Sequence, residues 1–139
     1  MAASTKLSNA VKALCYLTRV HPEPKNSSEI SSNTGLNASK LRRLLSMLTK
    51  NGIVASTQGT SGGFILNKKP EDIHLQEIYC AIEDRKAFHL DVNTDDTAPG
   101  VDMLGYNNYF NDLFSEIQVE IENKLRNITI KDILEKIFN

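Results

Sequence analysis

The stretch that most constrains the fold is ASKLRRLLSMLTKNG, residues 38–52 of a 139-residue chain. Leucines in it recur at positions i, i+3, i+4 and i+7, the spacing of a helix that buries one face. Asn37 is a candidate N-cap before the run, and Gly52 is a candidate stop after it. We therefore predict a helix over residues 38–51. Its inward face consists of Leu41, Leu44, Leu45 and Leu48.

The opposite face of this predicted helix is basic and carries hydroxyl groups. Successive side chains turn by about 100° around a helix, which decides the residues that lie opposite the leucines or on the shoulders. These residues are Ser39, Lys40, Arg42, Arg43, Ser46 and Lys50. No Asp or Glu occurs between Glu29 and Glu71. Such side chains suit DNA phosphates and base edges, so we predict that this helix enters the major groove.

Two further helical patterns precede it. Apolar residues recur on one face over residues 4–19, and Asn26 followed by Glu29 predicts a capped helix over residues 26–34. Gly35 supplies the turn before the basic helix. A short helix, a glycine turn and a second helix with a basic outer face have the order of a helix-turn-helix.

A glycine-rich stretch, Gly-Thr-Ser-Gly-Gly at residues 59–63, follows the basic helix. A phosphate-binding loop would open a helix, but here an apolar run, 64–66, and then Pro70 follow. The β-prone runs on both sides instead predict a hairpin over residues 53–66, which would be the wing of a winged helix. Candidate DNA contacts outside the basic helix are Lys6, Gln58, Thr60, Ser61, Lys68 and Lys69.

Charge is distributed unevenly although the net charge is only −1. Residues 1–70 hold ten Lys or Arg against two Asp or Glu, whereas residues 71–139 hold six against fifteen. This asymmetry predicts a polyanionic partner, double-stranded DNA, for the first half of the chain. Ordinary surface charge is the other interpretation.

The second half is predicted to be helical around a polar loop. We expect helices over residues 71–83 and 104–127, and a last helix after Thr129, with Asp132 as its capping partner. One apolar stripe follows the long helix: Tyr106, Phe110, Leu113, Phe114, Ile117, Ile121 and Leu125. Two partners could cover this stripe. One is the same helix of a second copy, in a homodimer, and the other is the stripe's own domain.

These patterns predict a mostly α fold with a small β-hairpin wing. Residues 1–84 would form a winged helix-turn-helix domain, and residues 85–139 an acidic loop, a long dimerisation helix and a C-terminal helix.

Residues suited to catalysis or to metal binding form no recognisable motif. His21, His74 and His89 have no second ligand at metal spacing. The acidic stretch 91–102 approaches a calcium-loop pattern, but Asp96 stands where that loop needs glycine. We therefore expect neither an enzyme, nor a metal site, nor a cofactor.

The cysteine content is low. Cys15 and Cys80 each lie beside an apolar helical stripe, so we expect both to be buried, with a thiol redox sensor as the alternative. Two cysteines suit a reducing compartment. We see neither a signal peptide nor an apolar run that could span a membrane, and we expect a cytoplasmic protein.

The sequence also resembles a known family over nearly its whole length. The segments that carry the resemblance are STK followed by AVKAL at residues 4–14, LNASKLRRLLSMLTKNGIVASTQGTSGGFIL at 36–66, and KKPEDIHLQEIYCAIE at 68–83. They are similar to the Rrf2 family of bacterial winged-helix transcriptional regulators. The resemblance implies a dimeric, sequence-specific DNA-binding regulator, a repressor, with an unidentified effector. A winged-helix module that binds protein and not DNA is the alternative.

Two departures from the family pattern are visible. Members that sense iron–sulfur chemistry carry three cysteines before the long helix, and residues 85–103 contain none. The chain therefore looks closest to the YwnA-like members, which lack an iron–sulfur cluster. Some members also place an arginine before the first wing glycine, where this chain has Gln58, which carries no charge for a narrow minor groove.

Overall fold

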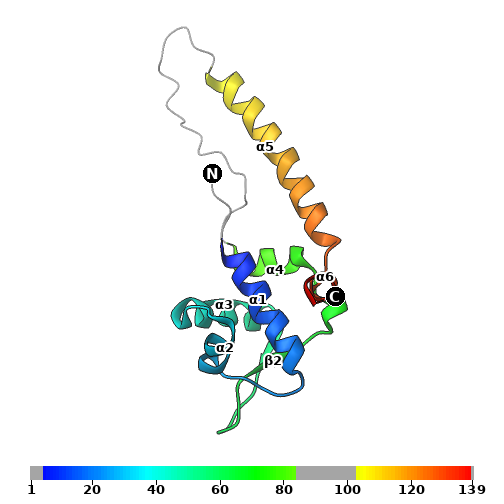
Figure 1. The fold of residues 1–139 in the computed structure, drawn as a ribbon. Coiled ribbons are helices and arrows are strands. Elements are labelled where there is room, and N and C mark those ends of the chain that lie inside the picture. The colour runs from blue at the N-terminus through cyan, green and yellow to red at the C-terminus, as the bar shows by residue number, and fades with distance from the viewer. Residues whose placement is uncertain (1–4, 84–102, 139) are drawn as a thin grey trace.

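The computed structural model describes residues 5–83 and 103–138 (Figure 1). These residues are mostly helical and include one antiparallel two-stranded hairpin, as the sequence predicts. The elements are α1 (Thr5–Val20), α2 (Ser27–Thr34), α3 (Ala38–Lys50), β1 (Val54–Ser56), β2 (Phe64–Leu66), the 3-10 turn η1 (Pro70–Asp72), α4 (Leu75–Ile82), α5 (Met103–Arg126) and α6 (Ile130–Phe138).

Caps fix the helix-turn-helix. The Glu29 N–H donates to Asn26 Oδ1 at 2.8 Å, and the Asn26 N–H donates to Glu29 Oε1 at 3.1 Å, which completes the predicted capping box of α2. Gly35 ends α2 in the left-handed region at φ 76°. The Asn37 side chain then caps α3 by accepting from the Lys40 N–H at 3.1 Å. The turn between the helices is therefore set by short-range sequence, as expected.

The hydrophobic core lies between α1, α2, α3 and α4. Leu41, Leu45 and Leu48 are fully buried, and Leu44 is 4% exposed. Burying a leucine stabilises a fold by about 1.5–3 kcal/mol. The main core partners from the neighbouring helices are Leu14, Leu17, Ile30, Ile78 and Ile82. This burial orients α3, because its leucine face is held inward and its opposite face is left in solvent.

The hairpin lies within the predicted residues 53–66 and has one further contact that the sequence did not indicate. β1 and β2 pair in register from Val54 with Leu66 to Ser56 with Phe64. In addition, the residue before α2's cap, Lys25, forms an isolated antiparallel bridge with Phe64. The wing is therefore attached at the first residue of β2 to the connection between α1 and α2.

The segment after the hairpin differs from the prediction of one helix over residues 71–83. It forms η1, then an extended break at Ile73 and His74, then α4. The break has a long-range cause: the Ile130 N–H donates to the Ile73 oxygen at 3.0 Å, and the Leu75 N–H donates to the Ile128 oxygen at 2.9 Å. The C-terminal segment thus forms hydrogen bonds with backbone groups of Ile73 and Leu75 that would otherwise bond within a continuous helix.

The long helix α5 rises away from the winged helix, and its C-terminal part lies against α4 (Figure 1). Gln118 on α5 is 2% exposed, and its Nε2 lies 3.5 Å from the Tyr79 hydroxyl on α4. Ile130 at the start of α6 is fully buried in the main core. The division of the chain at residue 84 stays a prediction, because residues 84–102 lie outside the described ranges.

Helix α6 is the last element of the fold and is held at both ends. Thr129 and Asp132 exchange the predicted capping bonds, at 3.0 Å and 3.1 Å. At its other end, the Arg19 guanidinium carbon on α1 lies 4.4 Å from the ring centre of Phe138. Of the helices in the described ranges, none has the length and apolar character needed to cross a membrane.

Candidate nucleic-acid interface

The outer face of α3 is solvent-exposed along its whole length. All the residues that the sequence placed there are exposed, namely Ser39, Lys40, Arg42, Arg43, Ser46 and Lys50. Four of them, Ser39, Arg42, Arg43 and Ser46, line a shallow hollow of about 500 Å³ together with Met47. The guanidinium groups and hydroxyls thus converge on one concave surface, which has the donors needed for base edges and phosphates.

A second hollow, of about 410 Å³, lies between the start of α1 and α3. Its lining includes three basic side chains, Lys6, Lys40 and Arg43. Thr5 and Asn9 add polar groups from α1. Sequence reasoning selected Lys6 for its charge and missed Thr5 and Asn9. Their i, i+4 spacing on the first helix, one turn apart, was the signal available.

The two acidic residues of the first half are ion-paired with a lysine outside α3. Glu23 and Glu29 both pair with Lys25, each at 3.6 Å. Among the ion pairs of the described residues, none involves Lys40, Arg42, Arg43 or Lys50. The positive charge of α3 is therefore available to an anionic partner.

The wing tip presents polar groups without charge. Gln58, Thr60 and Ser61 are all exposed. Gly59 turns the chain at φ 101°, in the left-handed region. The Gly63 N–H donates to Thr57 Oγ1 at 2.9 Å, which closes the base of the loop. The hairpin prediction is confirmed, and its tip can offer hydrogen bonds to a DNA backbone.

Lys68 and Lys69 lie at the opposite end of the hairpin, beyond Leu66, which pairs at the root with Val54. Lys68 is ion-paired, because its Nζ lies 2.7 Å and 3.0 Å from the two carboxylate oxygens of Glu77 on α4. Both lysines therefore lie away from the wing tip, and their contact with phosphates stays a prediction.

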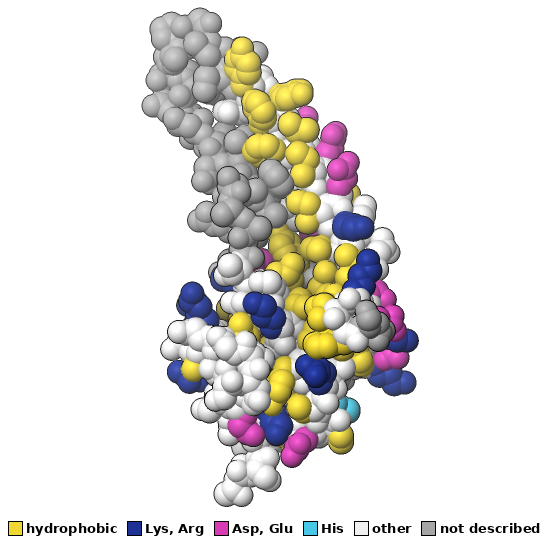
Figure 2. All heavy atoms as spheres, viewed as in Figure 1, with side chains coloured by type: hydrophobic (Ala, Val, Ile, Leu, Met, Phe, Trp, Pro, Cys, Tyr) yellow, Lys and Arg dark blue, Asp and Glu magenta, His cyan; other side chains and the backbone are white. Residues whose placement is uncertain are grey.

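The predicted dimerisation stripe is only partly covered within one chain. Tyr106 is 62% exposed and Phe110 is 41% exposed, whereas Leu113, Phe114, Ile117, Ile121 and Leu125 are half-buried. Leu104, Tyr109 and Val119, which the stripe did not include, are exposed as well. Apolar side chains run along α5 and continue to the lower body of the molecule (Figure 2).

Comparison with known proteins decides the family. A family model described as "Rrf2: Iron-dependent Transcriptional regulator" matches residues 3–136. The chain belongs to the Rrf2 family. It is thus a DNA-binding transcriptional regulator with a winged-helix fold, and the family is one of regulators and not of enzymes.

Individual relatives support this Rrf2 assignment. YwnA of Bacillus subtilis (strain 168), which has the provisional name of an HTH-type transcriptional regulator, is 30% identical over 128 residues, 91% of this chain and 94% of YwnA. The solved structure of T. potens IscR superposes with a TM-score of 0.71 at 26% identity, covering 98% of this chain and 88% of that one. CymR (YrzC), the global cysteine regulator of B. subtilis, shares the fold with a TM-score of 0.69 at 22% identity, over 98% of both chains.

The iron dependence in the family description can be tested against this chain's own donor groups. Iron–sulfur clusters are held by cysteine thiolates, usually four. This chain has two cysteines, and burial raises the pKa of the Cys15 thiol, which disfavours the thiolate. In residues 5–83 and 103–138, no group of three or more His, Cys, Asp or Glu could hold a metal ion. These residues do not fit an iron–sulfur cluster. The acidic stretch 91–102 lies outside the described residues.

The expectation for the cysteines is right for Cys15 and wrong for Cys80. Cys15 is buried in α1, but Cys80 is exposed on α4. Helix α4 buries Leu75, Ile78, Tyr79 and Ile82, and position 80 falls on its outer side. There the Gln76 Nε2 donates to the Cys80 Sγ at 3.2 Å.

Proposed function

We propose that this Rrf2 protein is a homodimeric, sequence-specific regulator that reads an operator with α3 in the major groove. The observation that carries the proposal is the outer face of α3, where exposed Arg42 and Arg43 converge with Ser39 and Ser46. Arginine can make a bidentate contact to guanine, and serine can reach bases or phosphates. We assign Ser39, Lys40 and Arg43 to base edges or their immediate surroundings.

Phosphate contacts would surround this helix. Arg42 lies on its shoulder, Ser46 and Lys50 lie further toward its C-terminal end, and Lys6 borders the hollow between α1 and α3. Gln58, Thr60 and Ser61 at the wing tip would follow the backbone of the adjacent groove. Lys68 and Lys69 are left out of this set, because they lie at the root of the hairpin and Lys68 is paired with Glu77.

The homodimer is proposed from the apolar face of α5. Leu104, Tyr106 and Tyr109 are each at least 60% exposed in a single chain. A symmetric contact through α5 would cover them and place two α3 helices on half-sites about 34 Å apart, one turn of DNA. We further propose that the protein is cytoplasmic and that its binding to the operator represses transcription. An effector would control this binding.

Enrichment of genomic DNA fragments by the purified protein tests the function. Fragments are recovered at two salt concentrations, because non-specific binding weakens steeply with salt. We expect a common two-fold symmetric sequence that persists at the higher salt. Recovery of unrelated fragments at low salt only would contradict sequence-specific binding. A reporter placed downstream of the recovered sequence then distinguishes repression, which we predict, from activation.

A further inference from the structure

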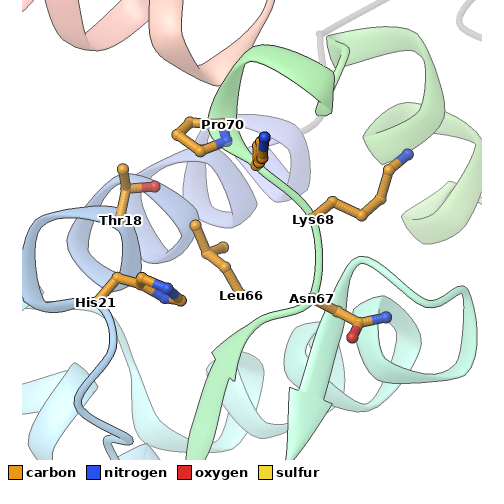
Figure 3. A pocket seen from close by; sticks show the side chains of 7 residues that line it. Thr18, His21, Leu66, Asn67, Lys68 and Pro70 are labelled. Carbon is orange, nitrogen blue, oxygen red and sulfur yellow. The ribbon is translucent and has the colours of Figure 1, made fainter.

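Another hollow lies at the root of the wing, and its lining includes no residue of α3 (Figure 3). It has a volume of about 420 Å³ and lies between the end of α1 and the chain that leads from β2 into η1. Its lining consists of Thr18, His21, Leu66, Asn67, Lys68, Lys69 and Pro70. Pockets for small molecules span about 300–1,000 Å³, so the space suffices for a small metabolite.

Two of the lining residues hold the wall in place. Lys68 points away from the hollow toward α4, where its ammonium group is bound by Glu77 (Figure 3). Asn67 also points away, and its Nδ2 donates to the Gly52 oxygen at 2.9 Å. The chain from Leu66 to Pro70 is thus fixed from outside the hollow.

The remaining groups define the chemistry of a ligand. Leu66 and Pro70 form an apolar surface, and His21 points into the space between them and α1 (Figure 3). Lys69 is exposed and contributes a positive charge. The structure describes all seven lining residues, and none of them is acidic. An apolar floor beside a lysine and a histidine suits a small organic anion.

Both walls of the hollow lead directly into the wing. On one side, residues 66–70 continue β2. On the other side, His21 is the first residue of the connection between α1 and α2. This connection is bound to β2 by the two backbone hydrogen bonds between Lys25 and Phe64. A ligand that joins these walls would therefore act on the orientation of the hairpin relative to α3.

We propose that this hollow is an effector site for a small organic anion, a carboxylate or phosphate ester with an apolar body, and that its occupancy changes the affinity for DNA. The second part rests on the proposed function. Coupling between such a site and DNA is reciprocal, because the ligand and the operator bias the same hairpin.

The site is tested first without DNA, by following backbone amide NMR signals of the full chain during titration. The probes are benzoate and phenyl phosphate, with benzamide as the uncharged match and inorganic phosphate as the match without an apolar body. We expect saturable shifts at His21 and at residues 66–69 with benzoate or phenyl phosphate, and the stronger probe identifies the headgroup. Equal shifts with benzamide, or no saturable shift with either anion, would overturn the site.

Matched variants make the same test specific. Lys69→Gln removes the charge at the hollow and should weaken probe binding about tenfold. Lys12→Gln removes an exposed lysine on α1 outside the lining and should leave it unchanged. Wild-type affinity in Lys69→Gln would contradict the role of this residue.

Regulation is tested by measuring affinity for a recovered operator with and without saturating probe. We expect a change of at least about fivefold in the wild type and none in Lys69→Gln. An unchanged affinity in the wild type would refute the regulatory part alone. A protein that binds no DNA would contradict the proposed function, whereas the NMR titration, which contains no DNA, still decides the site.

Discussion

Lys25 and Phe64 are joined by two backbone hydrogen bonds, from the Lys25 N–H to the Phe64 oxygen at 3.1 Å and from the Phe64 N–H to the Lys25 oxygen at 2.7 Å. This bridge attaches β2 to the segment before α2. It therefore couples the position of the wing to the helix-turn-helix, and it explains why the residue beside it is glycine. A Cβ at Gly63 would overlap the Lys25 carbonyl group.

The first prediction concerns this contact. Gly63→Ala should lower the free energy of unfolding by about 1–3 kcal/mol, because the added methyl group forces the two backbones apart. Urea denaturation followed by circular dichroism measures it. Ser61→Ala, at the exposed tip of the same loop, is the control and should keep wild-type stability. Wild-type stability in Gly63→Ala would show that the bridge does not hold the wing.

The second prediction concerns base reading. Arg43 is exposed on α3 and lines both hollows of the proposed DNA-binding surface. Arg43→Ala should weaken binding to the operator by about 1–3 kcal/mol and relax the preference at one base position. Titration of operator and scrambled duplexes across a salt series measures both effects. Lys12→Ala, outside both hollows on α1, is the control and should bind like the wild type.

Equal losses on the two duplexes would assign Arg43 to phosphates and not to bases. Wild-type binding to both would mean that this face of α3 does not enter the groove. Lys50→Ala is informative as a comparison, because a pure phosphate contact weakens all DNA equally and lowers the salt slope by about one unit.

The third prediction concerns the thiols. Burial raises the pKa of Cys15, so little thiolate is present near neutral pH, whereas Cys80 is exposed. In the native protein, a thiol reagent such as DTNB should react quickly with one cysteine. Cys80→Ser should abolish the fast phase, and Cys15→Ser should leave it. A fast phase that survives Cys80→Ser would contradict the burial of Cys15.

Local patterns predicted much of this fold. The leucine spacing placed a helix over residues 38–51, and α3 spans Ala38–Lys50. The caps at Asn26, Asn37 and Thr129 were visible because each is a hydroxyl or amide residue at a fixed distance from its partner. The exposed basic face of α3 was predicted from the same periodicity, because the side of a helix opposite its buried face is left in solvent.

Contacts between distant segments could not be read from the sequence. The break at Ile73 and His74 depends on backbone bonds to Ile128 and Ile130, and the pairing of Lys68 with Glu77 depends on the packing of α4. The sequence selected Lys68 for phosphate contact without indicating its ion pair, because charge alone does not show which carboxylate lies nearby. The hollow beside His21 likewise arises only when the end of α1 meets β2.

The fourth prediction concerns acid stability. The Thr129 backbone N–H first, and its hydroxyl second, hold the pKa of Asp132 below its ordinary value. The ionised carboxylate therefore stabilises the folded state above the unfolded pKa, about 3.9, and this contribution is lost as pH falls through the lower folded value. Chemical denaturation at a series of acidic pH values should show a weaker pH dependence in Asp132→Asn than in the wild type. Asp112→Asn, on the exposed side of α5, is the control. The same dependence of the free energy of unfolding on pH in Asp132→Asn and in the wild type would refute the stabilising role of the Asp132 carboxylate.

The fifth prediction concerns the homodimer. Phe110 is 41% exposed on α5, and its ring stacks in a tilted arrangement with Phe114 at 6.0 Å between centres. Phe110→Asp should convert a dimer into a folded monomer, because a carboxylate would be desolvated without a partner in the seam, whereas in the free chain it stays in water. Light scattering coupled to size exclusion at micromolar concentration measures the mass, and circular dichroism verifies the fold. Asn111→Asp adds the same charge at the next, exposed position, about 100° further around the helix, and should remain dimeric. A wild-type protein that is already monomeric would refute the dimer, and a dimeric Phe110→Asp would place the interface elsewhere than on this face of α5.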